Sequence, residues 1–314
     1  MAHMIETMAY AGETPWHGLG TKVSDNLSPA EMMKAAGLDW RVDKVPAYAK
    51  IGGKEVNVGW SALVRSSDNK HLATVPNDWN EVQNEEAFSF FKEWVDAGDM
   101  EMHTAGSLED GKRVWALAKT KEKFEVFGGD LIEDYFLLSS PHKYGMSFDA
   151  RSTKIRVVCN NTITMALNSE SQAAVRLSHR RKIDIDEVKA MVGISKVKLT
   201  AYKDLATYLG GKRATPDNIV QYFKDVFPLG TRDEEKKAQK MSRAATQALG
   251  VLDTQPGAEF ARGTWWPVFN AVTYVVDHEL GRSPDSRLSS AWFGYNRARK
   301  VKALERAVEY AEAA

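Results

Sequence analysis

Cysteine is almost absent from this chain, and so are long apolar runs. Cys159 is the one cysteine among 314 residues, which excludes an internal disulfide and a zinc site built from several cysteines. No stretch approaches the 18 or so uninterrupted apolar residues that would cross a bilayer. Residues 1–10 lack the basic start and apolar core of a signal peptide. We therefore expect a soluble, cytoplasmic protein in a reducing compartment, with no membrane segment.

Motifs of catalysis are also missing. We find no serine nucleophile elbow, no paired acid motif and no dinucleotide fingerprint, and Gly52-Gly53-Lys54 lacks phosphate-loop spacing. Asp99, Glu101 and His103 alternate along an expected strand, which is typical of a solvent-facing strand more than of a metal site. Asp277-His278-Glu279 falls on an expected helix, where neighbours point about 100° apart, so we interpret it as helix-end polarity. The sequence predicts no catalytic residue, metal or cofactor; a metal-dependent nuclease with scattered carboxylates is the enzymatic alternative.

Charge is balanced in total but not along the chain. Hydrophobic residues make up 43% and charged residues 27%, which is ordinary globular usage and argues against disorder. Lys+Arg and Asp+Glu number 42 each; residues 1–150 hold 15 against 24, a charge of −9, and residues 151–314 hold 27 against 18, a charge of +9. This split indicates a basic surface facing a polyanion or head-to-tail docking in an oligomer. The alternative is that the halves neutralise each other within one body.

Alternating residues predict a sheet in the first half of the chain. We expect strands over 40–48, 55–64, 71–75, 100–105, 113–119, 131–139 and 152–159. The second of these strands carries one apolar face made of Val56, Val58, Trp60, Ala62 and Val64. A helix capped by Asn84 has a core stripe formed by Ala87, Phe90, Phe91 and Trp94.

Helices dominate the second half. Asn160 and Asn161 are expected to cap a helix that follows the last strand. Thr215-Pro216 is a strong helix start, a further helix is expected from Thr264 to about residue 280, and the last one runs from about residue 287 to the end. The fold class is α+β, with a mostly antiparallel sheet and packed helices followed by a helical C-terminal part. We place a soft domain boundary between 1–170 and 171–314.

Basic residues gather between residues 151 and 203, where 11 Lys+Arg face 4 Asp+Glu. A cluster of arginines can bind phosphates bidentately and release counterions, and nearby aromatic rings can stack on bases. A solvated helix face or a subunit contact is the alternative interpretation. The candidate nucleic-acid-binding residues are Lys154, Arg156, Arg176, Arg180, Arg181, Lys182, Tyr144, Phe148 and Tyr202, with His179 inside the cluster.

The last expected helix carries a second basic stripe. Arg299, Lys302 and Arg306 lie at i, i+3 and i+7, opposite an apolar stripe that includes Leu288 and Trp292. This pattern is typical of a solvated helix face.

Three segments carry a family resemblance. They are Tyr10 to Gly20 (YAGETPWHGLG), Ile155 to Thr162 (IRVVCNNT) and Gly263 to His278 (GTWWPVFNAVTYVVDH). Together they resemble the phage- and plasmid-related proteins grouped as domain of unknown function 932, over nearly the whole chain. This resemblance implies a phage, prophage or plasmid context, in a host cytoplasm, and little chemistry.

The layout of the expected elements has a weaker resemblance, to phage single-strand annealing proteins of the Rad52-like group. Those proteins hold single-stranded DNA in a basic groove as rings or filaments, and no motif carries their residues over to this chain. We therefore expect a non-catalytic nucleic-acid-binding protein that anneals single-stranded DNA in recombination and acts as a homo-oligomer. The alternative is a protein-interaction factor that inhibits a host defence or assists replication.

Overall fold

The chain divides into two compact units. The structure is a computed structural model that describes residues 5–12, 19–156, 161–163, 174–184, 195–231, 233, 235 and 240–313. Unit 1 comprises Met1–Lys121, Tyr135–Ser152 and Gln172–Ile194, and unit 2 comprises Glu122–Asp134, Thr153–Ser171 and Ser195–Ala314. The predicted boundary at residue 170 falls inside the second stretch of unit 2, and independently folding domains stay a prediction.

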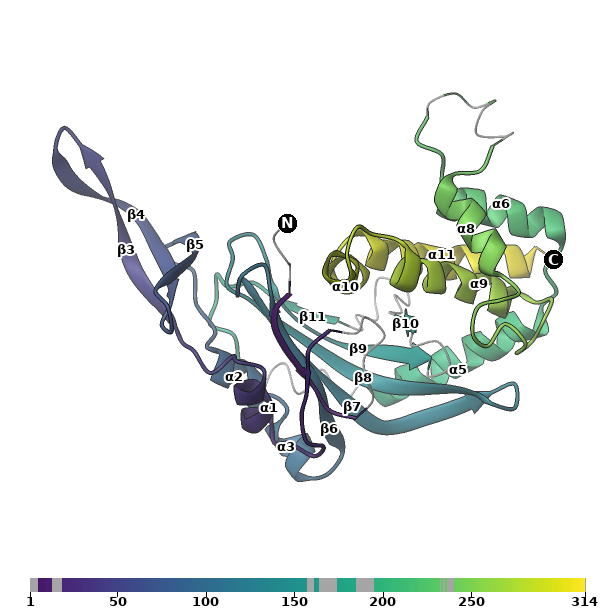
Figure 1. The fold of residues 1–314 in the computed structure, drawn as a ribbon, viewed down its shortest axis with the longest axis horizontal. Helices are drawn as coiled ribbons and strands as arrows, with labels where there is room; N and C mark the ends of the chain where they lie inside the picture. The colour runs from purple at the N-terminus through teal and green to yellow at the C-terminus, as the bar shows by residue number, and fades with distance from the viewer. Residues whose placement is uncertain are drawn as a thin grey trace. The chain divides into compact units, whose positions relative to one another are not determined.

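Strands make up most of unit 1 (Figure 1). The strands that lie wholly or partly in it are β1 (Ile5–Tyr10), β2 (Thr21–Lys22), β3 (Val42–Ile51), β4 (Lys54–Arg65), β5 (Lys70–Pro76), β6 (Met100–Leu108), β7 (Arg113–Val126), β8 (Asp130–Pro141), β9 (Phe148–Arg156) and β11 (Ala174–Leu177). Its helices are α1 (Pro29–Ala35), α2 (Asn84–Ser89) and α3 (Lys92–Asp96). The predicted α+β class, with a mostly antiparallel sheet, is confirmed.

Two sheets are present among the described residues. The larger has the strand order β10-β9-β8-β7-β6-β1-β2, in which β10 is Asn161–Ile163, with β11 paired to β9. The smaller has the order β3-β4-β5. Helices α1 and α2 contribute Met32 and Phe88 to the core cluster of unit 1. Phe90, which follows α2, stacks on Phe136 of β8 with ring centroids 5.1 Å apart. Burying such a side chain contributes about 1.5 to 3 kcal/mol, so these apolar residues hold the helices on the sheet.

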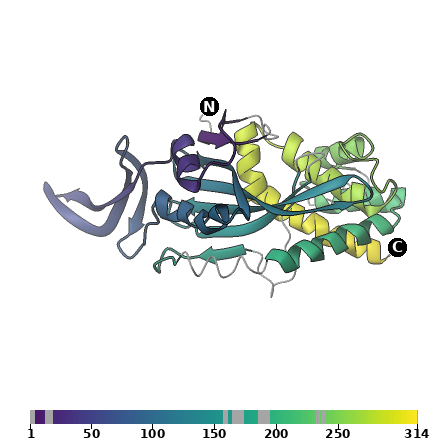
Figure 2. The ribbon, with the colours of Figure 1, turned by 90° about the horizontal axis from the view of Figure 1, so that it is seen from below.

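The β3–β4 hairpin forms an arm that extends beyond the core of unit 1 (Figures 1 and 2). Every residue from 50 to 60 is exposed, including Ile51, Val56, Val58 and Trp60. The predicted apolar face of this strand is therefore not the face that meets the core. The buried residues of β4 are Ser61, Leu63 and Arg65, and Arg65 is held by an ion pair to Glu6 at 2.7 Å.

The Asn84 side chain does not cap a helix as predicted. The residue before it, Gln83, is the N-cap of α2. The Asn84 amide instead donates to the carbonyl oxygens of Leu38 (2.9 Å) and Trp40 (3.2 Å), and its Oδ1 accepts from Nε2 of the fully buried His142 at 2.9 Å. Burial and the nearby His179 lower the pKa of His142 to about 3. His142 is thus a neutral imidazole inside the core.

Helices make up most of unit 2. They are α5 (Ser195–Gly211), α6 (Pro216–Val226), α8 (Arg243–Val251), α9 (Trp265–Tyr274), the π-helix η1 (Val275–Glu279), α10 (Pro284–Phe293) and α11 (Tyr295–Glu312). Pro216 and Thr264 mark helix starts as predicted, since α6 has Thr215 as N-cap and α9 has Thr264. The predicted last helix is two helices, α10 and α11, separated at Gly294. Asn161 lies in a short strand, β10 (Asn161–Ile163), where a helix was predicted.

Helix α9 is the centre of the unit 2 core. All residues from Trp265 to Thr273 are buried, and such an all-round burial is typical of a central helix. Trp266 donates its indole N–H to Oδ2 of buried Asp130 at 2.8 Å, and this bond joins α9 to the start of β8. Tyr222 of α6 donates to the carbonyl of Ala303 in α11 at 3.0 Å. Helices from distant parts of the chain are thereby tied to one core.

A buried ion pair connects η1 to α11. Lys300 Nζ lies 2.8 Å from Asp277 Oδ1, and the two side chains are 1% and 0% exposed. The interpretation of Asp277 as helix-end polarity is therefore wrong: its carboxylate faces the interior of unit 2. A charge without a partner is expensive to bury, so each group depends on the other.

Removing one partner of this pair should be costly. We expect Lys300→Met to lower the free energy of unfolding by about 3 to 5 kcal/mol, because the buried Asp277 carboxylate loses its ion pair with Lys300. The double variant Lys300→Met/Asp277→Leu should recover most of that loss. Lys92→Met, which breaks the exposed pair of Lys92 with Asp96, is the control and should cost at most about 1 kcal/mol. Urea unfolding followed by circular dichroism measures all three, and equal losses in the single and double variants would contradict the assignment.

The buried His142 should make stability depend on pH. Its pKa is about 3 in the folded chain, against the ordinary histidine value of 6.5, so the unfolded chain binds the proton first as the pH falls. The contribution of His142 to the free energy of unfolding is fully present above pH 6.5. It is lost as the pH falls from 6.5 towards 3, by about 1.4 kcal/mol per pH unit. Between about pH 7.5 and about pH 5 this amounts to about 2 kcal/mol.

The variant His142→Gln keeps a donor for Asn84 but does not titrate. We expect its unfolding free energy to fall by about 2 kcal/mol less than that of the wild type over that interval. Denaturant midpoints at the two pH values provide the comparison. Parallel pH profiles for the two proteins would show that His142 is not the group responsible.

Candidate nucleic-acid interface

Four of the predicted cations lie on the surface of unit 1, in and after β11. Arg180, Arg181 and Lys182 are exposed, and the Arg176 side chain is 60% exposed. Arg176 Nε donates to Asp149 Oδ2 at 3.2 Å, which leaves its other guanidinium donors available for a further acceptor. Exposed, closely spaced guanidinium groups are suited to bind phosphate oxygens.

Buried His179 anchors the turn that carries Arg180 and Arg181. The imidazole is buried and stacks on Trp79, with ring centroids 4.2 Å apart. Its Nδ1 donates to the carbonyl of Asn80 at 2.8 Å, and the Asn80 backbone amide donates back to the carbonyl of His179 at 2.7 Å. Burial lowers the pKa of His179, so this residue is a neutral support and not, as its place in the predicted cluster implied, one of the cations.

Strand pairing places the cations and an exposed aromatic residue, Tyr144, at the same end of the β9–β11 pair. In the antiparallel register Leu177 lies opposite Phe148, so the residues that follow Leu177 and the turn that precedes Phe148 leave the same end of this strand pair. Tyr144 in that turn is 47% exposed and meets Trp60 edge to face, with centroids 5.8 Å apart. Sequence analysis missed Trp60, because its alternation with valines predicted an inward face. The arm in which it lies leaves it 39% exposed.

Other predicted residues are withdrawn from the interface. Phe148 and Tyr202 are fully buried, Phe148 in the core of unit 1 and Tyr202 in that of unit 2, so neither ring can stack on a base. Lys154 was expected on a wet basic face, but it is 3% exposed and pairs with Asp134 at 2.7 Å. Arg156 pairs through its backbone with Asn161, and its side chain lies outside what the structure describes.

Metal and membrane sites find no support in the described part of the chain. No group of three or more His, Cys, Asp or Glu side chains there could hold a metal ion, and the triad of Asp99, Glu101 and His103 does not form one. Cys159 lies outside the described residues. Among the residues that were searched, no helix is long and apolar enough to cross a membrane.

Comparison with known proteins identifies the family. A family model described as "Domain of unknown function (DUF932)" matches residues 71–308, which is well over half of the chain. No curated protein and no solved structure matches the chain. The matched span begins in β5 and ends in α11, so it includes the turn of cations, Tyr144 and the core helices of unit 2. The chain belongs to the DUF932 family.

Proposed function

We propose that the chain is a non-catalytic protein that binds single-stranded nucleic acid on unit 1. The observation that carries the proposal is a group of exposed cations at the same end of the β9–β11 pair as Tyr144, namely Arg176 in β11 and Arg180, Arg181 and Lys182 after it. The cations would bind the phosphate backbone, and the aromatic pair of Tyr144 and Trp60 would stack on unpaired bases. Base stacking needs an unpaired base, which favours a single strand over a duplex.

Annealing in phage or plasmid recombination is the biological role that we propose for this binding. It rests on the resemblance in layout to single-strand annealing proteins, in which a sheet and its helices hold one DNA strand ready for a second. A protein of that kind needs no metal, cofactor or catalytic residue. It does need to release its strand to a complement, and a surface based on phosphate binding and stacking allows release because it reads no sequence.

The double variant Arg180→Ala/Arg181→Ala tests the role of these arginines in phosphate binding. We expect the slope of log affinity against log salt to fall by up to about 0.7 for each phosphate that is no longer neutralised. Tyr144→Ala should reduce the binding free energy of the oligonucleotide by about 1 to 3 kcal/mol for each base that no longer stacks on this ring, and should leave the salt slope unchanged. Fluorescence anisotropy with a labelled single-stranded oligonucleotide, between about 50 and about 300 mM salt, separates the two effects.

Lys203→Ala is the matched control, since Lys203 is an exposed cation of α5 in unit 2. It should bind with wild-type affinity and slope. Circular dichroism verifies that each variant is folded. If the Arg180→Ala/Arg181→Ala and Tyr144→Ala variants both bind with wild-type affinity, this surface is not the nucleic-acid interface. A wild type that does not bind single strands would overturn the proposed function.

A second candidate function, protein interaction, is favoured by the exposed arm. Tyr48 and Ile51 of β3 are 58% and 61% exposed, and Val56 and Val58 of β4 are each 43% exposed. Apolar side chains gathered on an extended element are typical of an interaction surface. We propose a second copy of this chain as the partner, because the charges of −9 and +9 on the two sequence halves offer complementary surfaces to a neighbouring copy.

Threonine substitutions test self-association through the arm. Ile51→Thr/Val56→Thr/Val58→Thr keeps the β-branched shape of the hairpin and removes apolar surface. We expect the wild type to exceed its single-chain mass of 35.0 kDa in light scattering, and the triple variant to return to it. Leu249→Gln, at a 38% exposed leucine of α8, is the control and should assemble like the wild type. A wild type that stays at the single-chain mass at every concentration would remove this candidate.

A further inference from the structure

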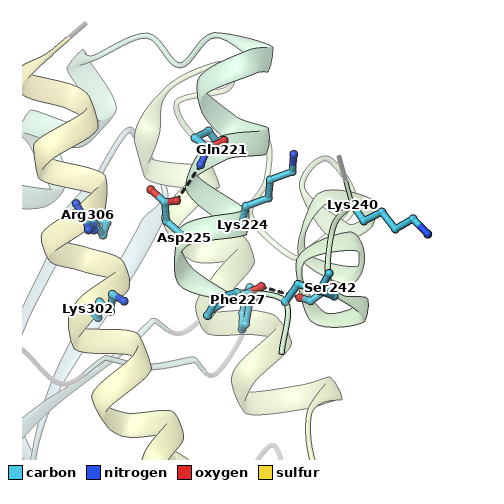
Figure 3. A pocket seen from close by; sticks show the side chains of 10 residues that line it. Gln221, Lys224, Asp225, Phe227, Lys240, Ser242, Lys302 and Arg306 are labelled. Atoms are coloured by element: carbon cyan, nitrogen blue, oxygen red, sulfur yellow. Dashed lines mark hydrogen bonds between the residues drawn. The ribbon is translucent and has the colours of Figure 1, made fainter. Parts of the chain in front are cut away.

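A cavity of about 430 Å³ opens in unit 2 between α6, the residues before α8 and one side of α11 (Figure 3). Small-molecule sites in proteins commonly have volumes of about 300 to 1,000 Å³. The cavity lies among described residues of a single unit and shares no residue with the cation turn of unit 1. It is therefore a feature of its own.

Four of the ten residues that line the cavity are cationic. Lys224 comes from α6, Lys302 and Arg306 from α11, and Lys240 from the rim near the start of α8, against the single carboxylate of Asp225. In Figure 3 Lys302 and Arg306 lie across from Asp225, and Lys240 extends away from the cavity. Without Lys240, three cations against one acid leave a charge of +2. Like charges repel one another when they are brought together, so such a lining favours an anion.

The carboxylate of Asp225 is already engaged. Its Oδ1 accepts from Gln221 Nε2 at 2.9 Å and its Oδ2 from the Tyr310 hydroxyl at 2.9 Å. These bonds hold Asp225 towards α11; burial, together with the bond from its own hydroxyl to Asp225, raises the pKa of Tyr310 to about 12. Both oxygens of Asp225 thus accept a hydrogen bond from a neutral group.

Two of the cations have no such engagement. Within the described residues, neither Lys240 nor Lys302 has a carboxylate within ion-pair distance or a side-chain hydrogen bond. Arg306 donates Nη1 to Glu309 at 2.5 Å, which leaves Nε and Nη2 as donors. The floor is apolar: Phe227 is buried and carries the Arg299 guanidinium 5.1 Å from its ring centroid. Arg299 thus adds a further positive charge beside the cavity.

We propose that this cavity binds a small ligand that carries at least two phosphate groups, such as a nucleoside diphosphate or triphosphate. A phosphate monoester carries about −1.5 to −2 at neutral pH, so two or more phosphate groups match the net charge of the lining, while one carboxylate does not. Lysine ammonium groups bind phosphate as point charges, and the arginine fork binds it through paired donors. The site is separate from the proposed nucleic-acid interface and does not depend on it.

Isothermal titration calorimetry of the full chain with ATP, inorganic pyrophosphate and AMP tests the proposal. We expect saturable 1:1 binding of ATP and pyrophosphate, and binding of AMP at least tenfold weaker. Lys302→Gln should weaken ATP binding by roughly tenfold, because one charge-assisted hydrogen bond is removed. Lys302→Arg keeps the charge and should restore binding to within about threefold.

Controls separate this site from the interface on unit 1. Lys203→Gln changes an exposed lysine of the same unit away from the cavity and should bind ATP like the wild type. The variant Arg180→Ala/Arg181→Ala should also bind ATP normally, whatever its effect on nucleic acid. Absence of ATP and pyrophosphate binding would overturn the proposal. So would equal losses in Lys203→Gln and Lys302→Gln, or a Lys302→Gln variant that loses oligonucleotide binding and keeps its affinity for ATP.

Discussion

The antiparallel pairing of β11 with β9 is the constraint on which the surface of unit 1 depends. Its register places Leu177 opposite Phe148, and both side chains are buried in the unit 1 core. The chain that follows Leu177 is held in place by buried His179, which stacks on Trp79, while Ser178 and Arg180 on either side of His179 are exposed. Arg180 and Arg181, which follow buried His179, are exposed, so the same short segment contains both the support and two cations of the proposed interface.

Two groups of charged residues have different roles in this chain, the buried ion pairs and the exposed cations. Lys154 with Asp134 and Lys300 with Asp277 are ion pairs buried within unit 2, while Arg180, Arg181 and Lys302 face solvent. The buried pairs contribute little net stability, because desolvation offsets most of their attraction, but each fixes which two elements meet. Only the exposed cations can recruit an anionic ligand. The two basic surfaces lie on different units, so a polymer and a small phosphorylated ligand would not compete for the same side chains.

Local signals in the sequence were sufficient where the residues involved are neighbours. Thr215-Pro216 marks the start of α6 and Thr264 that of α9, because capping and proline act within one helical turn. Ile219, Tyr222 and Phe223 of α6, spaced at i, i+3 and i+4, are all buried on one face of the helix. The signals were misleading for Asn84, whose amide serves two carbonyls more than forty residues away in sequence and leaves the cap to Gln83. The sequence around an asparagine that precedes an apolar stripe is the same whether its side chain caps the helix or binds distant carbonyls.

The sequence by itself determined the α+β class, the absence of a disulfide framework and the family, since these follow from composition, periodicity and motifs. Only the tertiary structure decided which side chains face water. The alternating pattern of β4 places Val58 and Trp60 on one face and Leu63 on the other. It does not show that the core ends near Ser61, nor that the hairpin continues beyond the core as an arm. A count of Lys and Arg cannot distinguish Lys154, buried against Asp134, from exposed Arg180. Exposure is a property of what packs against a residue, and the partners of these residues are distant in the sequence.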